Sequence, residues 1–373
     1  MAPHLDLSLD LSDVVALTEQ LVDIESVSLN ERAITDLVEQ ALTGRDHLHV
    51  QRFGNTIVAR TELGRGERVI LAGHLDTVPV NDNLPSRNDG EYLHGLGTSD
   101  MKGGDAVIIK LAAELTEPNR DLTYVLYDAE EIAAIHNGLG KLSTEHPELL
   151  EADFAILMES SRAEIEAGCQ GTLRIEVRTR GERAHSARAW TGSNAIHAAA
   201  PILAALNEYR PRRPVIDGLE YHEGLNAVAI GGGVAGNVIP DECVVTVNYR
   251  FAPDLSEAEA LAHVREVFAG YEVTCTDSSP GALPGLELPA AKAFVEAVGQ
   301  PVSPKFGWTD VARFSALGIP AVNYGPGDAE YAHKKDEKVL IARIRQCEDA
   351  LRAWLTGPTV PTVPTASTEE ETR

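Results

Sequence analysis

The stretch ILAGHLDTVPV, residues 70–80, places a histidine and an aspartate at the end of an apolar run. The apolar residues predict a buried strand, and Pro79 marks a turn after it. Because successive side chains of a strand point to opposite faces, His74 and Asp76 point to the same side. What these two groups bind there depends on the segments that surround the end of this strand.

Residues 1–170 alternate helical patterns with short apolar runs that predict buried strands. The runs are TIVAR (56–60), RVILAG (68–73), LTYVLY (122–127) and FAILM (154–158). Helical periodicity recurs in residues 14–22, in residues 34–42 after the candidate N-cap Asn30, and in residues 103–115. This alternation predicts an α/β unit with a mixed, largely parallel sheet and flanking helices.

A different order of elements begins near Gly171. Strand and helix patterns follow in the order β-α-β-β-α-β, with one helix from Asn194 to about Tyr209 and another capped by the pair Ser256 and Glu259. This order predicts an inserted, ferredoxin-like α+β domain. The α/β pattern then resumes, so we expect a discontinuous catalytic domain of residues 1–170 and 286–357, an inserted lid and dimerisation domain of residues 171–285, and a disordered Pro/Thr-rich and acidic tail of residues 358–373.

The composition excludes several classes of protein. A net charge of −25 would repel nucleic acid and anionic membranes. No apolar run approaches the roughly 18 residues that span a membrane, and the first residues do not read as a secretory signal. Four cysteines without CxxC spacing indicate neither a disulfide framework nor a thiolate metal site. We therefore expect a cytoplasmic protein with no nucleic-acid or membrane partner.

Histidine and acidic side chains recur where strands should end. The segments are GHLDT (73–77), GTSDMKGG (97–104), YDAEE (127–131), MES (158–160) and YAHKKDE (331–337). Ligands of an open α/β sheet gather at the carboxyl ends of its strands. Any one such segment is more often a surface or core feature, but together they indicate a hydrolytic centre for zinc, cobalt or manganese, because imidazole and carboxylate ligands leave exchangeable positions for water.

The motifs GHLDTVP, GLGTSDMKGG, AEE and AHKKDE, taken together, resemble those of the co-catalytic two-zinc amidohydrolases. That family includes aminoacylase, bacterial carboxypeptidase, acetylornithine deacetylase and succinyl-diaminopimelate desuccinylase. The resemblance covers roughly residues 10–355 and is greatest to desuccinylases of the actinobacterial type. It implies hydrolysis of a linear amide with two Zn²⁺ ions, for which Co²⁺ or Mn²⁺ could substitute.

The resemblance also implies the ligands of the two ions. His74, Asp100 and Glu159 would bind one ion, and Asp100, Glu131 and His333 the other. The shared carboxylate of Asp100 would offset the repulsion between the two cations. A cis peptide bond is implied between Asp100 and Met101.

Three further residues take catalytic roles through the same resemblance. Asp76 would orient the imidazole of His74. Glu130 would be the general base, although Ala129 stands where the family usually has aspartate. His185, in RGERAHSAR, would hydrogen-bond the tetrahedral intermediate in the active site of a partner subunit, which implies a homodimer through the inserted domain.

The implied substrate is N-succinyl-LL-2,6-diaminopimelate, an intermediate of diaminopimelate and lysine biosynthesis with three carboxylates. Arginine forks and neutral donors would bind these groups. The candidate substrate-binding residues are Arg178, Arg188, Asn237, Arg250, Arg313 and Gly325. Two alternatives stay open: an acetylornithine deacetylase or related metallo-exopeptidase, and a non-catalytic binding protein on the same fold.

Overall fold

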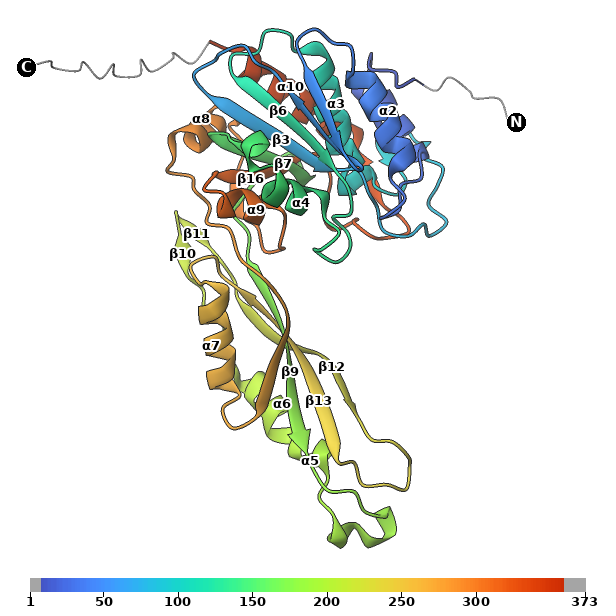
Figure 1. The fold of residues 1–373 in the computed structure, drawn as a ribbon, viewed down its shortest axis with the longest axis vertical. Coiled ribbons are helices and arrows are strands. Elements are labelled where there is room, and N and C mark those ends of the chain that lie inside the picture. Colours follow the sequence, from blue (N-terminus) through green and yellow to red (C-terminus); the bar gives the residue numbers. More distant parts are fainter. Residues whose placement is uncertain (1–7, 359–373) are drawn as a thin grey trace, which may run out of the picture. The chain divides into compact units, whose positions relative to one another are not determined.

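The computed structural model describes residues 8–358, and the chain divides into two compact units (Figure 1). The α/β unit contains the chain up to residue 166, residues 285–303 and the chain from residue 313. The inserted unit contains residues 167–284 and 304–312. The short segment 304–312 therefore groups with the insertion, whereas the sequence analysis assigned it to the domain that follows. The predicted tail lies outside the described residues apart from Pro358.

An eight-stranded sheet forms the centre of the α/β unit, in the order β1-β2-β6-β3-β7-β16-β8-β15. Its strands are β1 His49–Phe53, β2 Thr56–Arg60, β3 Arg68–His74, β6 Asp121–Tyr127, β7 Phe154–Ser160, β8 Ile165–Ala167, β15 Val302–Pro304 and β16 Ala321–Gly325. Strand β3 pairs in parallel with β6 and β7, β7 pairs in parallel with β16, and β2 pairs antiparallel with β1 and β6. The predicted mixed, largely parallel sheet is confirmed.

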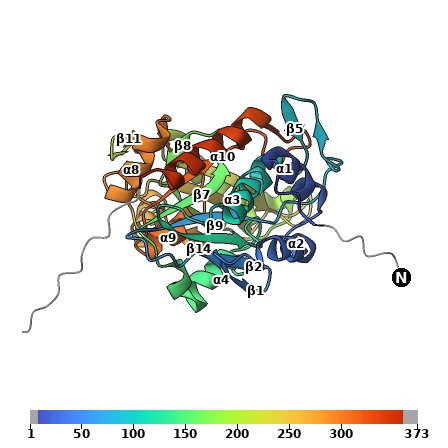
Figure 2. The same cartoon turned by 90° about the horizontal axis from the view of Figure 1, so that it is seen from above.

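Helices cover both faces of this sheet. They are α1 Val14–Asp23, α2 Arg32–Leu42, α3 Gly103–Glu114, α4 Gly138–Glu145, α8 Pro289–Val298, α9 Val311–Ala316 and α10 Ile341–Thr356, with the short 3₁₀ turn η2 Pro147–Leu150. Strand order reverses at β3, because the chain passes from β3 to β6 on one side and then to β7 on the other. Right-handed crossovers therefore put α3 and α4 on opposite faces (Figure 2). Such a reversal leaves a crevice at the carboxyl ends of the strands, where ligands bind.

Some local details differ from the sequence analysis. Asn30 does not cap α2; Glu31 precedes the helix, and its side chain makes no cap hydrogen bond to it. A small sheet in the order β17-β5-β4 was not predicted, and its strands are β17 Lys338–Leu340, β5 Tyr92–His94 and β4 Arg87–Asn88. None of the helices between residues 8 and 358 combines the length and apolar character needed to cross a bilayer.

The inserted unit contains a four-stranded antiparallel sheet in the order β12-β13-β9-β14. Its elements are β9 Gly171–Arg180, η3 Ser186–Thr191, α5 Ala195–Ala198, α6 Ala200–Glu208, the hairpin β10 Val215–Ile216 and β11 Leu219–Glu220, β12 Gly224–Gly232, β13 Glu242–Phe251, α7 Glu257–Val267 and β14 Glu272–Ser279. The helices cover one sheet face through a core that includes Val245, Val247 and Ile202. The predicted capping box of Ser256 and Glu259 is present. The predicted helix from Asn194 breaks in two near Pro201, which lacks the N–H that a continuous helix needs.

Candidate metal centre

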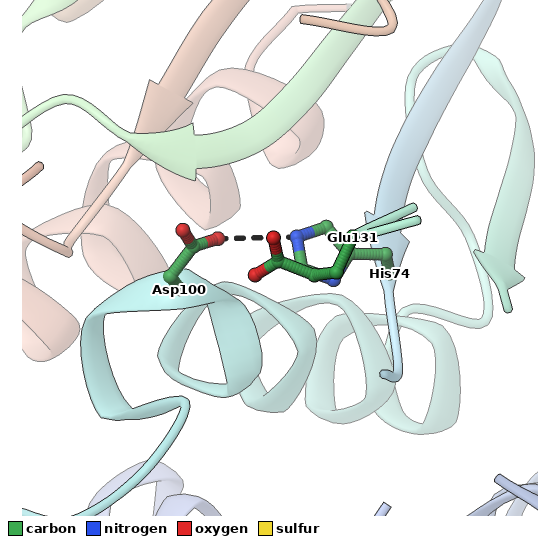
Figure 3. Close-up of side chains that lie close together, drawn as sticks. All are labelled: His74, Asp100 and Glu131. Carbon is green, nitrogen blue, oxygen red and sulfur yellow. Dashed lines mark hydrogen bonds and ion pairs between the residues drawn. The ribbon is translucent and has the colours of Figure 1, made fainter. Parts of the chain in front are cut away.

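Three potential metal ligands meet at the carboxyl ends of β3 and β6. His74 is the last residue of β3, and Glu131 follows β6. Asp100 lies in η1, the irregular turn Thr98–Lys102 that leads into α3. One ligand atom from each of these side chains lies within 4.8 Å of the others (Figure 3). His74 is completely buried, so its imidazole is held in a fixed orientation by its surroundings.

The two oxygens of Asp100 face two different imidazoles. Oδ1 lies 3.1 Å from Nε2 of His74, and Oδ2 lies 3.4 Å from Nε2 of His333. His333 Nε2 also lies 3.0 Å from Oε1 of Glu131. A carboxylate that divides its oxygens in this way is suited to bridge two cations, each of which would have one imidazole on its outer side.

The fifth predicted ligand belongs to the same cluster. Glu159 lies on β7, next to β3, and its Oε1 is 3.9 Å from Nε2 of His74. The structure thus brings together all five side chains that the sequence analysis assigned to the metals. The cis peptide bond expected between Asp100 and Met101 is also present.

Charge in this cluster is strongly coupled. Burial favours the neutral form of Asp100, but hydrogen bonds with His333 and His74 outweigh it and hold the pKa of Asp100 well below its ordinary value. Hydrogen bonds with Asp100 and Glu131 raise the pKa of His333 to about 10. Burial alone would lower the pKa of His74, yet Asp100 and Asp76 raise it well above its ordinary value. The carboxylates of this cluster are therefore stabilised by positive charge beside them, as they would be at a site for divalent cations. Imidazole and carboxylate groups are also suitable ligands for such ions.

Asp76 has a wider role than the sequence analysis assigned to it. Nδ1 of His74 lies 3.1 Å from the main-chain oxygen of Asp76 and 3.5 Å from its Oδ1. The buried carboxylate instead accepts two main-chain N–H bonds, from Glu130 to Oδ1 at 2.9 Å and from Glu131 to Oδ2 at 3.2 Å. Asp76 therefore fixes the turn that carries the predicted base and a predicted ligand.

The turn that carries Glu130 is also held at its other end. Asp128 accepts a hydrogen bond from the hydroxyl of Thr56 at 2.7 Å. Ala129 has φ of +56°, an uncommon conformation for a residue with a side chain, and the chain reverses there between β6 and the glutamate pair. The turn is therefore anchored on both sides of residue 129, where the family usually has aspartate.

Glu337 is a supporting residue that the sequence analysis missed. Its Oε1 accepts N–H bonds from Ser99 at 2.9 Å and from Asp100 at 3.0 Å. Burial raises the pKa of this carboxyl to about 7. Glu337 joins the segment that carries His333 to the turn that carries Asp100. Its position in the motif AHKKDE was the available signal, but the sequence does not show which amides it would contact.

His185 lies in the inserted unit, and its side chain is exposed. Its Nδ1 accepts a hydrogen bond from the N–H of Ala187 at 3.0 Å. The neutral imidazole therefore carries its proton on Nε2, which is free to act as a donor. This is the form that could stabilise a developing oxyanion.

Two of the substrate-binding candidates have other partners. The guanidinium of Arg178 lies 2.6 Å from Glu242 and within 4.0 Å of Glu176 and Glu272, so its fork is already occupied by carboxylates. The N–H of Gly325 donates to the hydroxyl of Ser161 at 2.9 Å. A side chain at residue 325 would collide with the main chain of β7, so this glycine is needed for packing. Neither contact tests substrate binding, so both assignments stay predictions.

The other candidates differ in their surroundings. Nη1 of Arg250 is buried and has no hydrogen-bond partner among the described residues. Arg188 and Asn237 are exposed in the inserted unit. Arg313, on α9, lies so close to Gly140 that a side chain at residue 140 would contact its guanidinium. Arg250 is therefore the candidate with the strongest need for an anionic partner.

Comparisons with known proteins agree with this geometry. Residues 70–356 match the model of peptidase family M20/M25/M40. A Mycobacterium tuberculosis protein provisionally named as a succinyl-diaminopimelate desuccinylase is 56% identical over 353 residues, which cover 94% of this chain and 100% of that protein. The succinyl-diaminopimelate desuccinylase of Corynebacterium glutamicum is 47% identical over 367 residues, covering 95% of this chain and 99% of that protein.

Solved structures share the fold at low sequence identity. An M20 family metallo-carboxypeptidase from Sulfolobus solfataricus has a TM-score of 0.76 at 16% identity and covers 92% of this chain and 99% of its own. A dinuclear metal-binding M20 peptidase from Bacillus subtilis has a TM-score of 0.70 at 18% identity, covering 93% of this chain and 97% of its own. The chain belongs to peptidase family M20/M25/M40.

Proposed function

We propose that this protein is a two-metal amide hydrolase that converts N-succinyl-LL-2,6-diaminopimelate and water to succinate and LL-2,6-diaminopimelate, in diaminopimelate and lysine biosynthesis. The observation that carries the proposal is the cluster of two imidazoles and three carboxylates around Asp100. The names of the two relatives at 56% and 47% identity support the acyl group. We propose zinc as the physiological metal, with Co²⁺ or Mn²⁺ as substitutes, and a cytoplasmic location.

Two divalent cations bound at this cluster would polarise the amide carbonyl and make a water molecule a better nucleophile. His74, Asp100 and Glu159 would hold one ion, and Asp100, Glu131 and His333 the other. Each assignment agrees with the imidazole that faces each oxygen of Asp100. The protein supplies the orientation of these side chains.

Glu130 is the proposed general base. Glu131 turns its carboxylate toward His333, at 3.0 Å, and the base is assigned to the residue that precedes it. Glu130 would accept a proton from the attacking water and pass it to the nitrogen of the leaving amine. Its main-chain N–H is fixed by Asp76, so the base is held in place by the same carboxylate that fixes Glu131.

Oxyanion stabilisation is assigned to His185 of a second copy of this chain. The Nε2–H that its hydrogen bond with Ala187 imposes is the donor that a developing negative charge requires. Arg250, Arg313, Arg188 and Asn237 are the proposed ligands for the carboxylates of the substrate. Nη1 of Arg250, which is buried and has no hydrogen-bond partner within residues 8–358, supports its place in this group.

Homodimerisation through the inserted unit is supported by an exposed sheet edge. Strand β12 is an edge strand, and its side chains Val228 and Ile230 are 58% and 52% exposed. Leu203 on α6, which contacts β12, is 42% exposed. An apolar edge strand left open would promote aggregation, and pairing with a second copy would cover it.

The decisive experiment compares two substrates. Metal-free protein is loaded with zinc and incubated with N-succinyl-LL-2,6-diaminopimelate or with N-acetylornithine, and a chelator is added to a parallel sample of each. We expect succinate release that the chelator abolishes, with much slower release of acetate. Faster acetate release would identify the deacetylase alternative, and no zinc-dependent turnover of either substrate would favour a binding protein.

A further inference from the structure

Asp76 is itself held by a hydroxyl from a distant part of the chain. Oγ of Ser28, in the loop between α1 and α2, donates to Oδ2 of Asp76 at 2.7 Å. This is shorter than the 2.9 Å and 3.2 Å bonds that the same carboxylate accepts from the glutamate turn. A hydrogen bond from a neutral hydroxyl to an ionised, fully buried carboxylate is among the stronger kinds in a protein.

The local backbone directs this hydroxyl. Residues 26–28 run beside residues 75–77: the N–H of Ser28 donates to the main-chain oxygen of Thr77 at 3.1 Å, and the N–H of Thr77 donates to that of Ser26 at 3.0 Å. Val27 and Thr77 form a parallel bridge. The position of Ser28 is therefore fixed relative to the strand end that carries Asp76.

The next residue is held in a strained conformation. Leu29 has φ of +72°, which is unfavourable for a side chain branched beyond Cβ, and its side chain is 65% exposed. Its N–H donates to Oε1 of the buried Glu31 at 2.6 Å, and Oε2 of Glu31 accepts from Asn55 at 3.2 Å. Strain of this kind persists only where surrounding contacts impose it, and it is typical of functional sites. Here it turns the chain immediately after Ser28.

We propose that Ser28 is a positioning residue for Glu130 and Glu131, which it acts on through Asp76. The hydroxyl prevents the carboxylate of Asp76 from rotating and so keeps each oxygen aligned with one main-chain N–H of the turn. Ser28 bonds to Oδ2, the oxygen that also accepts the longer bond from Glu131. Loss of the hydroxyl should therefore disturb Glu131, and the metal ion that it would hold with His333, more than the ion beside His74.

The chain offers a matched control in the same loop. Ser26 also donates its hydroxyl at 2.7 Å, but to the main-chain oxygen of Leu75. Ser26→Ala and Ser28→Ala each remove one hydroxyl from one loop, and only the second removes a contact with Asp76. Ser28→Thr keeps the hydroxyl and serves as the rescue variant.

The test measures kcat, KM, zinc affinity and thermal unfolding for the full chain. We expect Ser28→Ala to lower kcat by roughly 10- to 100-fold with little change in KM, and to weaken binding of one of two zinc ions. Ser28→Thr should recover most of both losses, and Ser26→Ala should lower the unfolding temperature with kcat close to that of the wild type. Equal kcat and zinc affinity in Ser28→Ala and Ser26→Ala would overturn the proposal.

Two features of the design keep the result interpretable. If Ser28→Ala does not fold, Ser28→Cys replaces it, because a thiol is a weak donor of similar size. The kinetic part rests on the proposed function, whereas zinc affinity, measured by competition with a chelator, does not. If the wild type fails to release succinate, the proposed function fails, and the comparison of zinc affinities still decides the role of Ser28.

Discussion

Asp76 is buried and Asp100 is part-buried beside His74, and their oxygens have different sets of partners. Asp100 faces two imidazoles, a setting for a carboxylate that binds cations. Asp76 faces two main-chain N–H groups and a hydroxyl, a setting that satisfies its charge without a metal. The same residue type therefore serves as a metal ligand in one position and as a structural anchor in the other.

The adjacent glutamates provide the first prediction. Glu130→Gln should retain full zinc content but lower kcat by roughly 10²- to 10⁴-fold, because the amide cannot accept the proton of water. Glu131→Gln, the matched change one residue away, should lose zinc as well as activity. Metal analysis and steady-state kinetics on both variants check this. Wild-type kcat in Glu130→Gln would remove that residue from its proposed role.

For single residues, the sequence identifies the candidate metal ligands better than the residues that hold those ligands in place. The candidate ligands lie in motifs that resemble those of the two-zinc amidohydrolases, and that resemblance selected them. Ser28 is 48 residues from Asp76, and Glu337 is 237 residues from Asp100. Their hydrogen bonds depend on how distant segments meet, and no local pattern encodes that.

At the scale of elements, Asp121 shows how one carboxylate joins a loop to a strand. Asp121 begins β6, and its oxygens accept N–H bonds from Leu63 at 2.7 Å and Arg65 at 2.8 Å and a hydroxyl bond from Thr61 at 3.0 Å. Burial acts to raise the pKa of Asp121, but these hydrogen bonds lower it below its ordinary value of 3.8. The ionised form is therefore the one that stabilises the folded state.

The second prediction follows from the lowered pKa of Asp121. Asp121→Asn should destabilise the metal-free protein by about 1–3 kcal/mol at pH 7, since an amide cannot accept all three bonds. A lowered pKa means that the wild-type advantage is complete above pH 3.8 and is lost as the pH falls through the folded-state value. Urea unfolding of both proteins between pH 7 and pH 3 measures the difference. A difference that does not shrink on acidification would contradict the assignment to this carboxylate.

Elements with strong periodicity were predictable, and elements made by distant pairing were not. The strands β3, β6 and β7 coincide with the apolar runs, because strands covered on both faces need continuous apolar sequence. Strands β4, β5 and β17 have two or three residues each; β4 and β5 pair locally, and β17 joins them from a distant part of the chain. A strand of two or three residues is too short for an alternation of apolar and polar side chains to be recognised in the sequence.

The third prediction concerns the exposed edge β12. Ile230→Lys should convert a dimer into a monomer of 40.1 kDa, because a charge cannot be buried against a second copy. Val215→Lys is the control: Val215 is 65% exposed and lies on the separate hairpin β10–β11 of the same unit. Sedimentation velocity measures the mass of both variants. A dimeric Ile230→Lys protein would exclude this edge from the interface.

At the scale of the whole molecule, the fourth prediction tests whether His185 acts on the partner subunit. His185→Ala and Glu130→Gln chains should each be inactive and should regain activity when mixed as heterodimers. Random pairing in equal amounts gives half heterodimers, each with one complete site, so recovery should approach about one quarter of wild-type activity. A protein that carries both substitutions is the control and should not recover on mixing. Confirmed heterodimers without activity would place the function of His185 within its own chain.

The order of strand and helix patterns in each segment predicted the α/β sheet and the inserted α+β sheet. The local pattern could not place residues 304–312, which group with the inserted unit although they follow residues 285–303 of the α/β unit. Nor could it show how the arginines of the insertion are paired. Arg178 and Arg180 both lie within 4.0 Å of Glu242 and Glu272, so neighbouring strands neutralise the arginines of β9.

The discontinuity of the α/β unit has a consequence for synthesis on the ribosome. Strand β16 lies inside the sheet, between β7 and β8, and the chain that forms it follows the whole insertion. A nascent polypeptide that ends before residue 321 therefore has a gap in that sheet and also lacks His333. The four strands of the inserted unit, by contrast, have all been translated by residue 279. Binding of both proposed ions must accordingly wait until residue 333 has been translated.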